Sequence, residues 1–100
     1  MKIFELENES GEVFAFEVRN TLLSRKKAIR IIEALPGAKV VEKPKNLSLN
    51  NKEEFCLFEF KGAFFVIWEP WNDNSRYWIG SKPTEYNPNI NLIIEHFSKC

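Results

Sequence analysis

The sequence has few of the residues that disulfides, metal sites and catalytic sites use most. Its 100 residues include two cysteines, one histidine and a single aspartate. Cys56 lies in an apolar run, where a free cysteine commonly packs as a small hydrophobic side chain. Without an export signal at the start of the chain, both Cys56 and Cys100 are predicted to be reduced thiols. His96 and Cys100 are four residues apart, but no paired ligand motif accompanies them, so no metal and no cofactor are predicted.

Motifs of the common enzyme classes are also missing. The chain has no glycine-rich phosphate loop, no GxSxG and no HExxH. The candidate catalytic groups are Glu69, Asp73, Arg76 and His96. An enzyme with a small pocket near residues 72–75 is therefore the less favoured alternative, and a non-catalytic protein is the favoured one.

Long apolar runs are absent too. None approaches the roughly 18 residues that a membrane-spanning helix needs. The hydrophobic share of 44% and the nine phenylalanines indicate a folded chain. The length predicts a single α+β domain covering residues 1–100. We expect a soluble, cytoplasmic protein, bacterial in style, with no membrane partner.

The net charge of the chain is zero, but acidic and basic residues are unevenly distributed along it. Residues 1–18 carry one lysine against five glutamates, and residues 19–45 carry eight basic against two acidic residues. The remainder carries five basic against seven acidic residues. A basic segment of this kind can bind an anionic partner, although it is a weak signal by itself.

The hydrophobic pattern predicts the order ββαβββα. Strand-like runs cover 2–7, 12–18, 38–44, 53–60 and 63–69, residues 76–80 could form a last strand, and helical spacing covers parts of 21–37 and 90–97. Lys61 and Gly62 form a plausible two-residue hairpin turn. The predicted fold is a two-layer, mostly antiparallel sheet of five to six strands with two helices packed on it. Helices on one face would leave the other face open as a partner or dimer surface, with Ile3, Val13 and Ala15 as candidates.

The first helix has an unusual start. Ser24 is a good N-cap, and Ala28, Ile31, Ile32 and Leu35 give an apolar stripe. Basic residues in the first turn oppose the helix dipole, but they would also favour an anion there. The alternative function is therefore a nucleic-acid or phosphate binder that uses Arg25, Lys26, Lys27 and Arg30.

All three tryptophans lie between residues 68 and 78, around the polar stretch 72–75. One interpretation is an aromatic hairpin closed by that stretch, since cross-strand aromatic pairs stabilise hairpins. Counting register from the turn pairs Trp71 with Arg76, Glu69 with Trp78 and Trp68 with Ile79.

The other interpretation is a recognition surface made of Trp71, Asp73, Arg76 and Tyr77. Tryptophan, tyrosine and arginine dominate binding hot spots, because they offer rigid contact area and a planar hydrogen-bonding fork. This pattern predicts a protein-interaction or regulatory module, such as an adaptor, an inhibitor or an immunity-like protein. Its partner would be another protein or a second copy in a homodimer, and nucleic acid is the less favoured partner.

Overall fold

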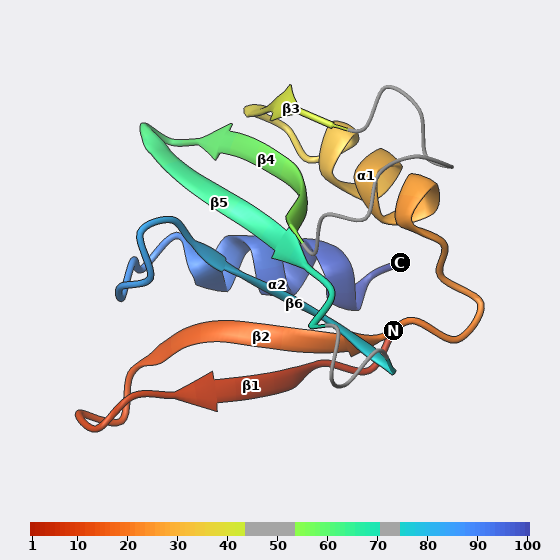
Figure 1. Cartoon of the computed structure of the whole chain (residues 1–100). Helices are drawn as coiled ribbons and strands as arrows, with labels where there is room; N and C mark the ends of the chain where they lie inside the picture. The colour runs from red at the N-terminus through yellow and green to blue at the C-terminus, as the bar shows by residue number, and fades with distance from the viewer. Residues whose placement is uncertain (44–53, 71–74) are drawn as a thin grey trace.

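The computed structural model describes residues 1–43, 54–70 and 75–100 and is drawn in Figure 1. The elements are β1 (Phe4–Glu7), β2 (Val13–Arg19), α1 (Arg25–Glu33), β3 (Ala38–Glu42), β4 (Glu54–Phe60), β5 (Ala63–Trp68), β6 (Arg76–Ser81) and α2 (Ile90–Ser98). The order along the chain is ββαββββα, which is the predicted ββαβββα with one strand more, because the possible last strand at 76–80 forms β6.

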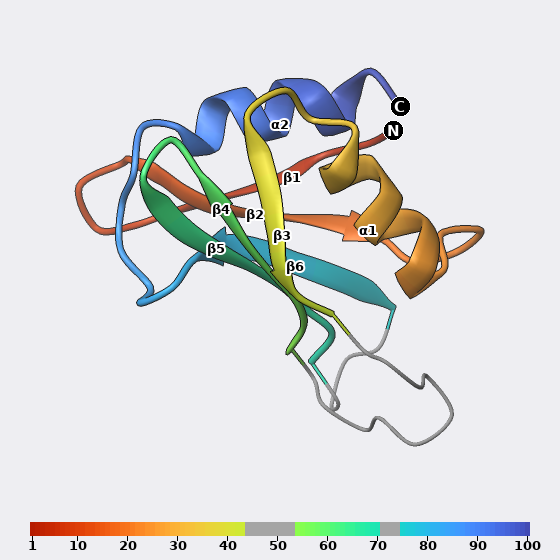
Figure 2. The ribbon, with the colours of Figure 1, turned by 90° about the horizontal axis from the view of Figure 1, so that it is seen from above.

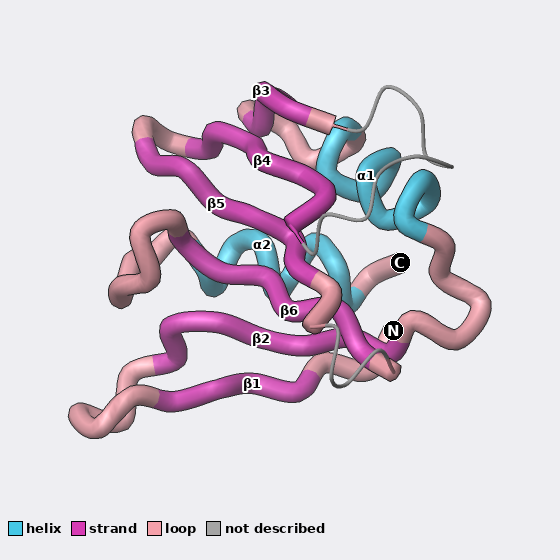
Figure 3. Tube along the Cα trace, in the orientation of Figure 1, coloured by secondary structure: helices cyan, strands magenta, loops and turns pink. Residues whose placement is uncertain are grey.

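The strands form one six-stranded sheet in the order β1-β2-β6-β5-β4-β3, and every neighbouring pair is antiparallel (Figure 3). β6 lies between β2 and β5, so residues of β2 and β6 that are about 60 positions apart in the sequence become neighbours. The predicted α+β class and the antiparallel sheet are therefore confirmed.

Both helices pack on the same face of the sheet, as the two perpendicular views show (Figures 1 and 2). Between this face and the helices lies a phenylalanine-rich core, to which β2, β4, β5 and α2 contribute Phe16, Phe58, Phe65 and Phe97. Phe16 and Phe97 meet edge to face with ring centroids 5.4 Å apart, which joins α2 to β2. The packed layer between sheet and helices is the two-layer solution expected for this pattern.

Local sequence features explain where elements begin and end. Lys61 and Gly62 both have positive φ, +50° and +79°, as a tight two-residue hairpin turn between β4 and β5 requires. The side chain of Ser24 accepts a hydrogen bond from the backbone N–H of Lys27 and so caps α1. The hairpin turn and the cap were both predicted from the sequence.

Two predicted side-chain placements are wrong. Ala28, Ile32 and Leu35 of the predicted apolar stripe are buried, but the fourth buried residue is Ile29, whereas Ile31 is only partly buried. Ile3 packs against the core instead of contributing to the open side of the sheet. Within the described part of the chain, no helix has the length and apolar character that a membrane crossing needs.

Candidate binding face

The face of the sheet opposite the helices is the candidate site. Strand alternation and register place five side chains on it in one cross-strand row: Phe4, Glu17, Trp78, Trp68 and Glu54. Neither α1 nor α2 covers this side (Figure 2). We call the surface made by this row and its neighbours on the same side the open face.

The observed register differs from the predicted one by one residue. Trp68 is opposite Trp78, and Ile67 is opposite Ile79. Because successive side chains alternate between the two faces, this register buries both isoleucines in the core and brings both indoles to the open face. The two indole rings meet edge to face, with centroids 5.8 Å apart and an interplanar angle of 80°.

A glycine allows one of these indoles to lie against the sheet. A Cβ added at Gly80 would come within 2.5 Å of Cη2 of Trp78 and within 2.9 Å of two further ring carbons. The six-membered ring of Trp78 therefore occupies the space over Gly80, a close approach that glycine inside a strand permits. Ala15 and Val66, which flank Gly80 in the sheet, are 0% and 3% exposed although no helix covers them.

Beside the tryptophans the surface is hollowed by a cleft of about 390 Å³. Its lining residues are Glu54, Val66, Trp68, Trp78, Ser81, Lys82 and Thr84. At its rim, Nζ of Lys82 donates a hydrogen bond of 2.6 Å to Oε1 of Glu54, and this carboxylate raises the pKa of the lysine. The buried hydroxyl of Ser81 accepts a hydrogen bond from the backbone N–H of Glu85, which holds the loop along one side of the cleft.

The four residues of the predicted recognition surface lie in different environments. Trp71 and Asp73 lie outside the described residues. The guanidinium of Arg76 is on the open face, 3.2 Å from Oε1 of Glu17 and 3.7 Å above the ring of Phe4. The side chain of Tyr77 is only 3% exposed and points into the core.

Tyr77 belongs to a polar cluster that ties β6 to the segment before α1. Its hydroxyl donates a hydrogen bond of 2.7 Å to the carbonyl of Leu23. Burial, with a smaller effect of the nearby Glu69 carboxylate, raises the pKa of Tyr77 to about 12, and Arg25 opposes the shift. These contacts give Tyr77 a structural role in the core, on the side of β6 opposite the open face.

Glu69, one of the candidate catalytic groups, forms an ion pair with Arg25 at the start of α1. Oε1 of Glu69 lies 2.8 Å from both Nε and Nη2 of Arg25, and its Oε2 accepts a hydrogen bond from Asn20. The guanidinium of Arg25 also lies over the ring of Phe55, 4.8 Å from its centroid. This carboxylate therefore anchors the loop before α1 to the end of β5.

The predicted anion site on the first helix is changed by that pairing. Arg25 is half-buried and held by Glu69, while Lys26, Lys27 and Arg30 are exposed. Those three side chains form no ion pair with any residue in the described ranges. The structure thus leaves a set of three cations where the sequence suggested four.

The histidine and the cysteines have structural surroundings. Nε2 of His96 lies 2.7 Å from the carbonyl oxygen of Ile31, which links α2 to α1. Cys56 is a buried free thiol, and burial raises its pKa to about 12, whereas Cys100 is free and exposed. Over residues 1–43, 54–70 and 75–100, no group of three or more His, Cys, Asp or Glu side chains is arranged to hold a metal.

Most of the residues that line the cleft could not be recognised as site residues from the sequence. Glu54, Lys82 and Thr84 come from segments that carry no recognisable motif. One local signal was present: Gly80 inside a strand, two residues after Trp78, is typical of a site where a ring approaches the backbone. The pairing of β4, β5 and β6 is what brings these residues together.

Fold and site together define an α+β domain with one open, aromatic sheet face. No protein-family model, curated protein or solved structure in the comparisons matches this chain. The chemistry of the open face is therefore the feature of this chain that can indicate a function.

Proposed function

We propose that this chain is a non-catalytic protein-interaction module, a regulator or an inhibitor, whose recognition surface is the open face. The observation that carries the proposal is the pair Trp68–Trp78 beside a cleft on the side of the sheet that the helices leave uncovered. The proposed occupant is a partner protein that places an apolar side chain into this cleft.

The residue types of the face support a protein partner. Tryptophan and arginine are over-represented among the side chains that contribute most to protein–protein affinity, and such anchors lie within a more polar rim. Here the ion pairs Glu17–Arg76 and Glu54–Lys82 flank the two tryptophans. Each of these ion pairs is neutral in itself, so the two tryptophans lie within a rim of paired charges.

The alternative through the first helix has less support. A nucleic-acid site needs several cations that face the phosphates, and Arg25 is held by Glu69. Aromatic side chains for base stacking are absent from the described contacts of Lys26, Lys27 and Arg30. We therefore favour the open face over α1 as the binding surface.

Affinity capture with a pair of matched variants tests the proposal. Phe64 is on the open face and 45% exposed, and it lies opposite Glu59, so Phe64→Lys adds a charge that β4 can pair. Leu92→Lys makes the same change on α2, where the side chain is 41% exposed. We expect a partner to be captured by the wild type and by Leu92→Lys but weakened about tenfold or more by Phe64→Lys, because a lysine in an apolar interface must be desolvated.

The same experiment separates the open face from the segment that contains Trp71. Trp71→Ala is added as a bait, because Trp71 was predicted from the sequence to be a contact residue. Size-exclusion chromatography of the wild type and of Phe64→Lys tests self-association as the alternative occupant. Equal capture of every partner by the wild type and by folded Phe64→Lys, or a dimer that only Phe64→Lys abolishes, would contradict the proposed partner protein.

A further inference from the structure

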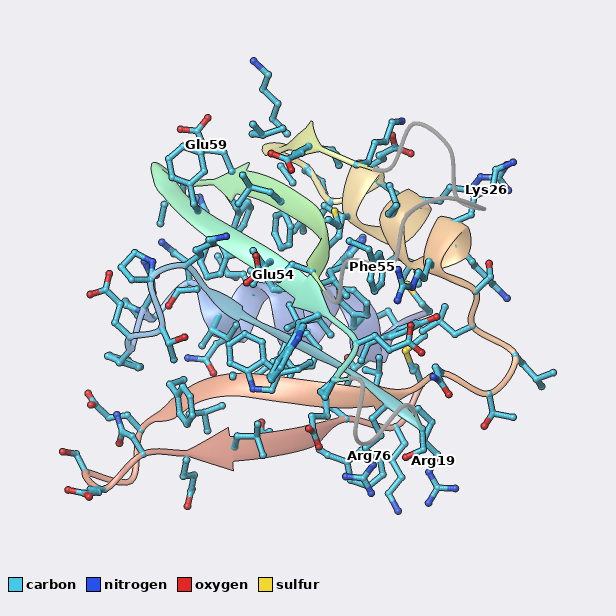
Figure 4. The ribbon with its side chains drawn as sticks, viewed as in Figure 1. Arg19, Lys26, Glu54, Phe55, Glu59 and Arg76 are labelled. Atoms are coloured by element: carbon cyan, nitrogen blue, oxygen red, sulfur yellow. The ribbon has the colours of Figure 1, made fainter. Side chains whose placement is uncertain are left out.

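We infer that Lys2, Arg19 and Arg76 form an oxyanion-binding site at one end of the open face. The starting observation is the register of β2 and β6, in which Arg19 lies directly opposite Arg76. Directly opposed residues of antiparallel strands project from the same face, and like charges in such a pair are destabilising. Figure 4 shows the two labelled arginines next to each other at this end of the sheet.

The ring of Phe4 gathers the three cations. The guanidinium carbon of Arg76 lies 3.7 Å from the ring centroid, that of Arg19 lies 5.7 Å away, and Nζ of Lys2 lies 5.2 Å away. Cations near an aromatic face are attracted by its quadrupole, so Phe4 attracts all three groups to this end of the open face without neutralising them.

Carboxylates neutralise only part of this charge. Oε1 of Glu17 lies 3.2 Å from Nη1 of Arg76. In the described part of the chain, Arg19 and Lys2 have no ion pair. Among the described residues, three cations against one paired carboxylate leave an excess of two positive charges around the ring of Phe4.

The ligand class follows from the donor groups. A guanidinium offers a planar fork of N–H donors that matches carboxylate and phosphate oxygens, and two adjacent forks can hold one oxyanion between them. An oxyanion bound there would also remove the repulsion between Arg19 and Arg76. The site is therefore assigned to a carboxylate or a phosphate group, and it stands independently of the proposed role of Trp68 and Trp78.

Titration with small anions tests the site directly. Side-chain Nε–H signals of ¹⁵N-labelled protein are followed by NMR while inorganic phosphate or acetate is added at constant ionic strength, so that general screening does not change. We expect saturable shifts of the Arg19 and Arg76 signals in the millimolar range. The anion that binds more tightly identifies the source of the oxyanion, a phosphate group or an acidic side chain.

Two charge-matched variants complete the test. Arg19→Gln removes one cation of the site, and Arg30→Gln removes one exposed cation from α1. Affinity is expected to fall about fivefold or more in Arg19→Gln, because a charge-assisted hydrogen bond is lost, and to stay unchanged in Arg30→Gln. Shifts that never saturate, or an equal loss in both variants, would overturn the assignment.

Phe64→Lys separates this site from the proposed function. Phe64 contacts neither arginine in the ring contacts described above, so phosphate or acetate affinity is expected to persist in that variant. If the wild type captures its partner but binds neither phosphate nor acetate, the oxyanion site is refuted and the proposed function is not.

Discussion

At the scale of single residues, the relation between Gly80 and Trp78 decides the shape of the candidate site. The indole lies over the glycine, where any larger residue would meet its ring. Trp78 thereby shields the strands beneath it and still forms one wall of the cleft. One glycine therefore allows an aromatic ring to serve both the sheet and the surface.

Gly80→Ala is predicted to destabilise the protein by about 1–3 kcal/mol, because overpacking forces the Trp78 ring out of its position. Urea denaturation gives the free energy of unfolding, and near-UV circular dichroism reports the indole environment. The control is a double-mutant cycle with Trp78→Ala, in which most of the Gly80→Ala penalty should disappear. A penalty of the same size in both backgrounds would show that the ring does not occupy this space.

Tyr77→Phe is predicted to reduce stability by about 1–3 kcal/mol, because the carbonyl of Leu23 loses a buried hydrogen-bond donor. The pH dependence has a definite sign. Since folding raises the pKa of Tyr77 from 10.0 to about 12, the phenol contributes stability that is complete below pH 10.0 and is lost as the pH rises toward 12. Ultraviolet titration of tyrosinate in the wild type and in Tyr77→Phe should assign the late ionisation to this residue. An ionisation of Tyr77 near pH 10.0 in the folded protein would contradict its buried position.

At the scale of secondary-structure elements, Ser24 fixes the start of α1. Its hydroxyl is the only side-chain cap at that end of the helix within the described contacts, at 3.1 Å from the N–H of Lys27. Ser24→Ala is predicted to lower the free energy of unfolding by about 1 kcal/mol, measured by chemical denaturation. Ser10→Ala, in the exposed turn between β1 and β2, is the control and should change stability by less than about 0.5 kcal/mol. Equal effects of the two variants would argue against the cap.

The elements were predictable because their signals are local. Strand alternation, helical spacing, the Lys61–Gly62 turn and the Ser24 cap each depend on a few adjacent residues. The register of β5 and β6 could not be predicted in the same way, because it depends on which side chains are buried in the core. Burial of Ile67 and Ile79 moved the pairing by one residue and brought Trp68 and Trp78 to the same side.

Most of the candidate site could not be predicted for a related reason. Its pairs join residues that are distant in the sequence, such as Arg25 with Glu69, Arg76 with Glu17 and Lys82 with Glu54. The strand order determines which of these side chains come into contact, and the strand order follows from the packing of the whole sheet. The clustering of aromatic residues around Arg76 within 68–78 did indicate a region of interest, and it also favoured Tyr77, whose side chain lies in the core.

At the scale of the whole molecule, the two layers leave the protein asymmetric. The helices bury one face of the sheet (Figure 2). The opposite face keeps two tryptophans, a cleft and flanking ion pairs. Exposed apolar surface rimmed by polar groups is typical of protein-interaction sites. We therefore expect a partner to bind this face and not α1 or α2.

The most direct test of that claim is a ¹⁵N NMR titration with the protein captured by the wild-type bait. Indole N–H signals of Trp68 and Trp78, assigned with Trp68→Phe and Trp78→Phe, report on the open face, and the backbone amides of α1 and α2 report on the opposite layer. We expect both indole signals to shift or broaden on binding while the exposed residues of the two helices stay unchanged. Unchanged indole signals, with shifts confined to α1 or α2, would contradict the open face as the recognition surface.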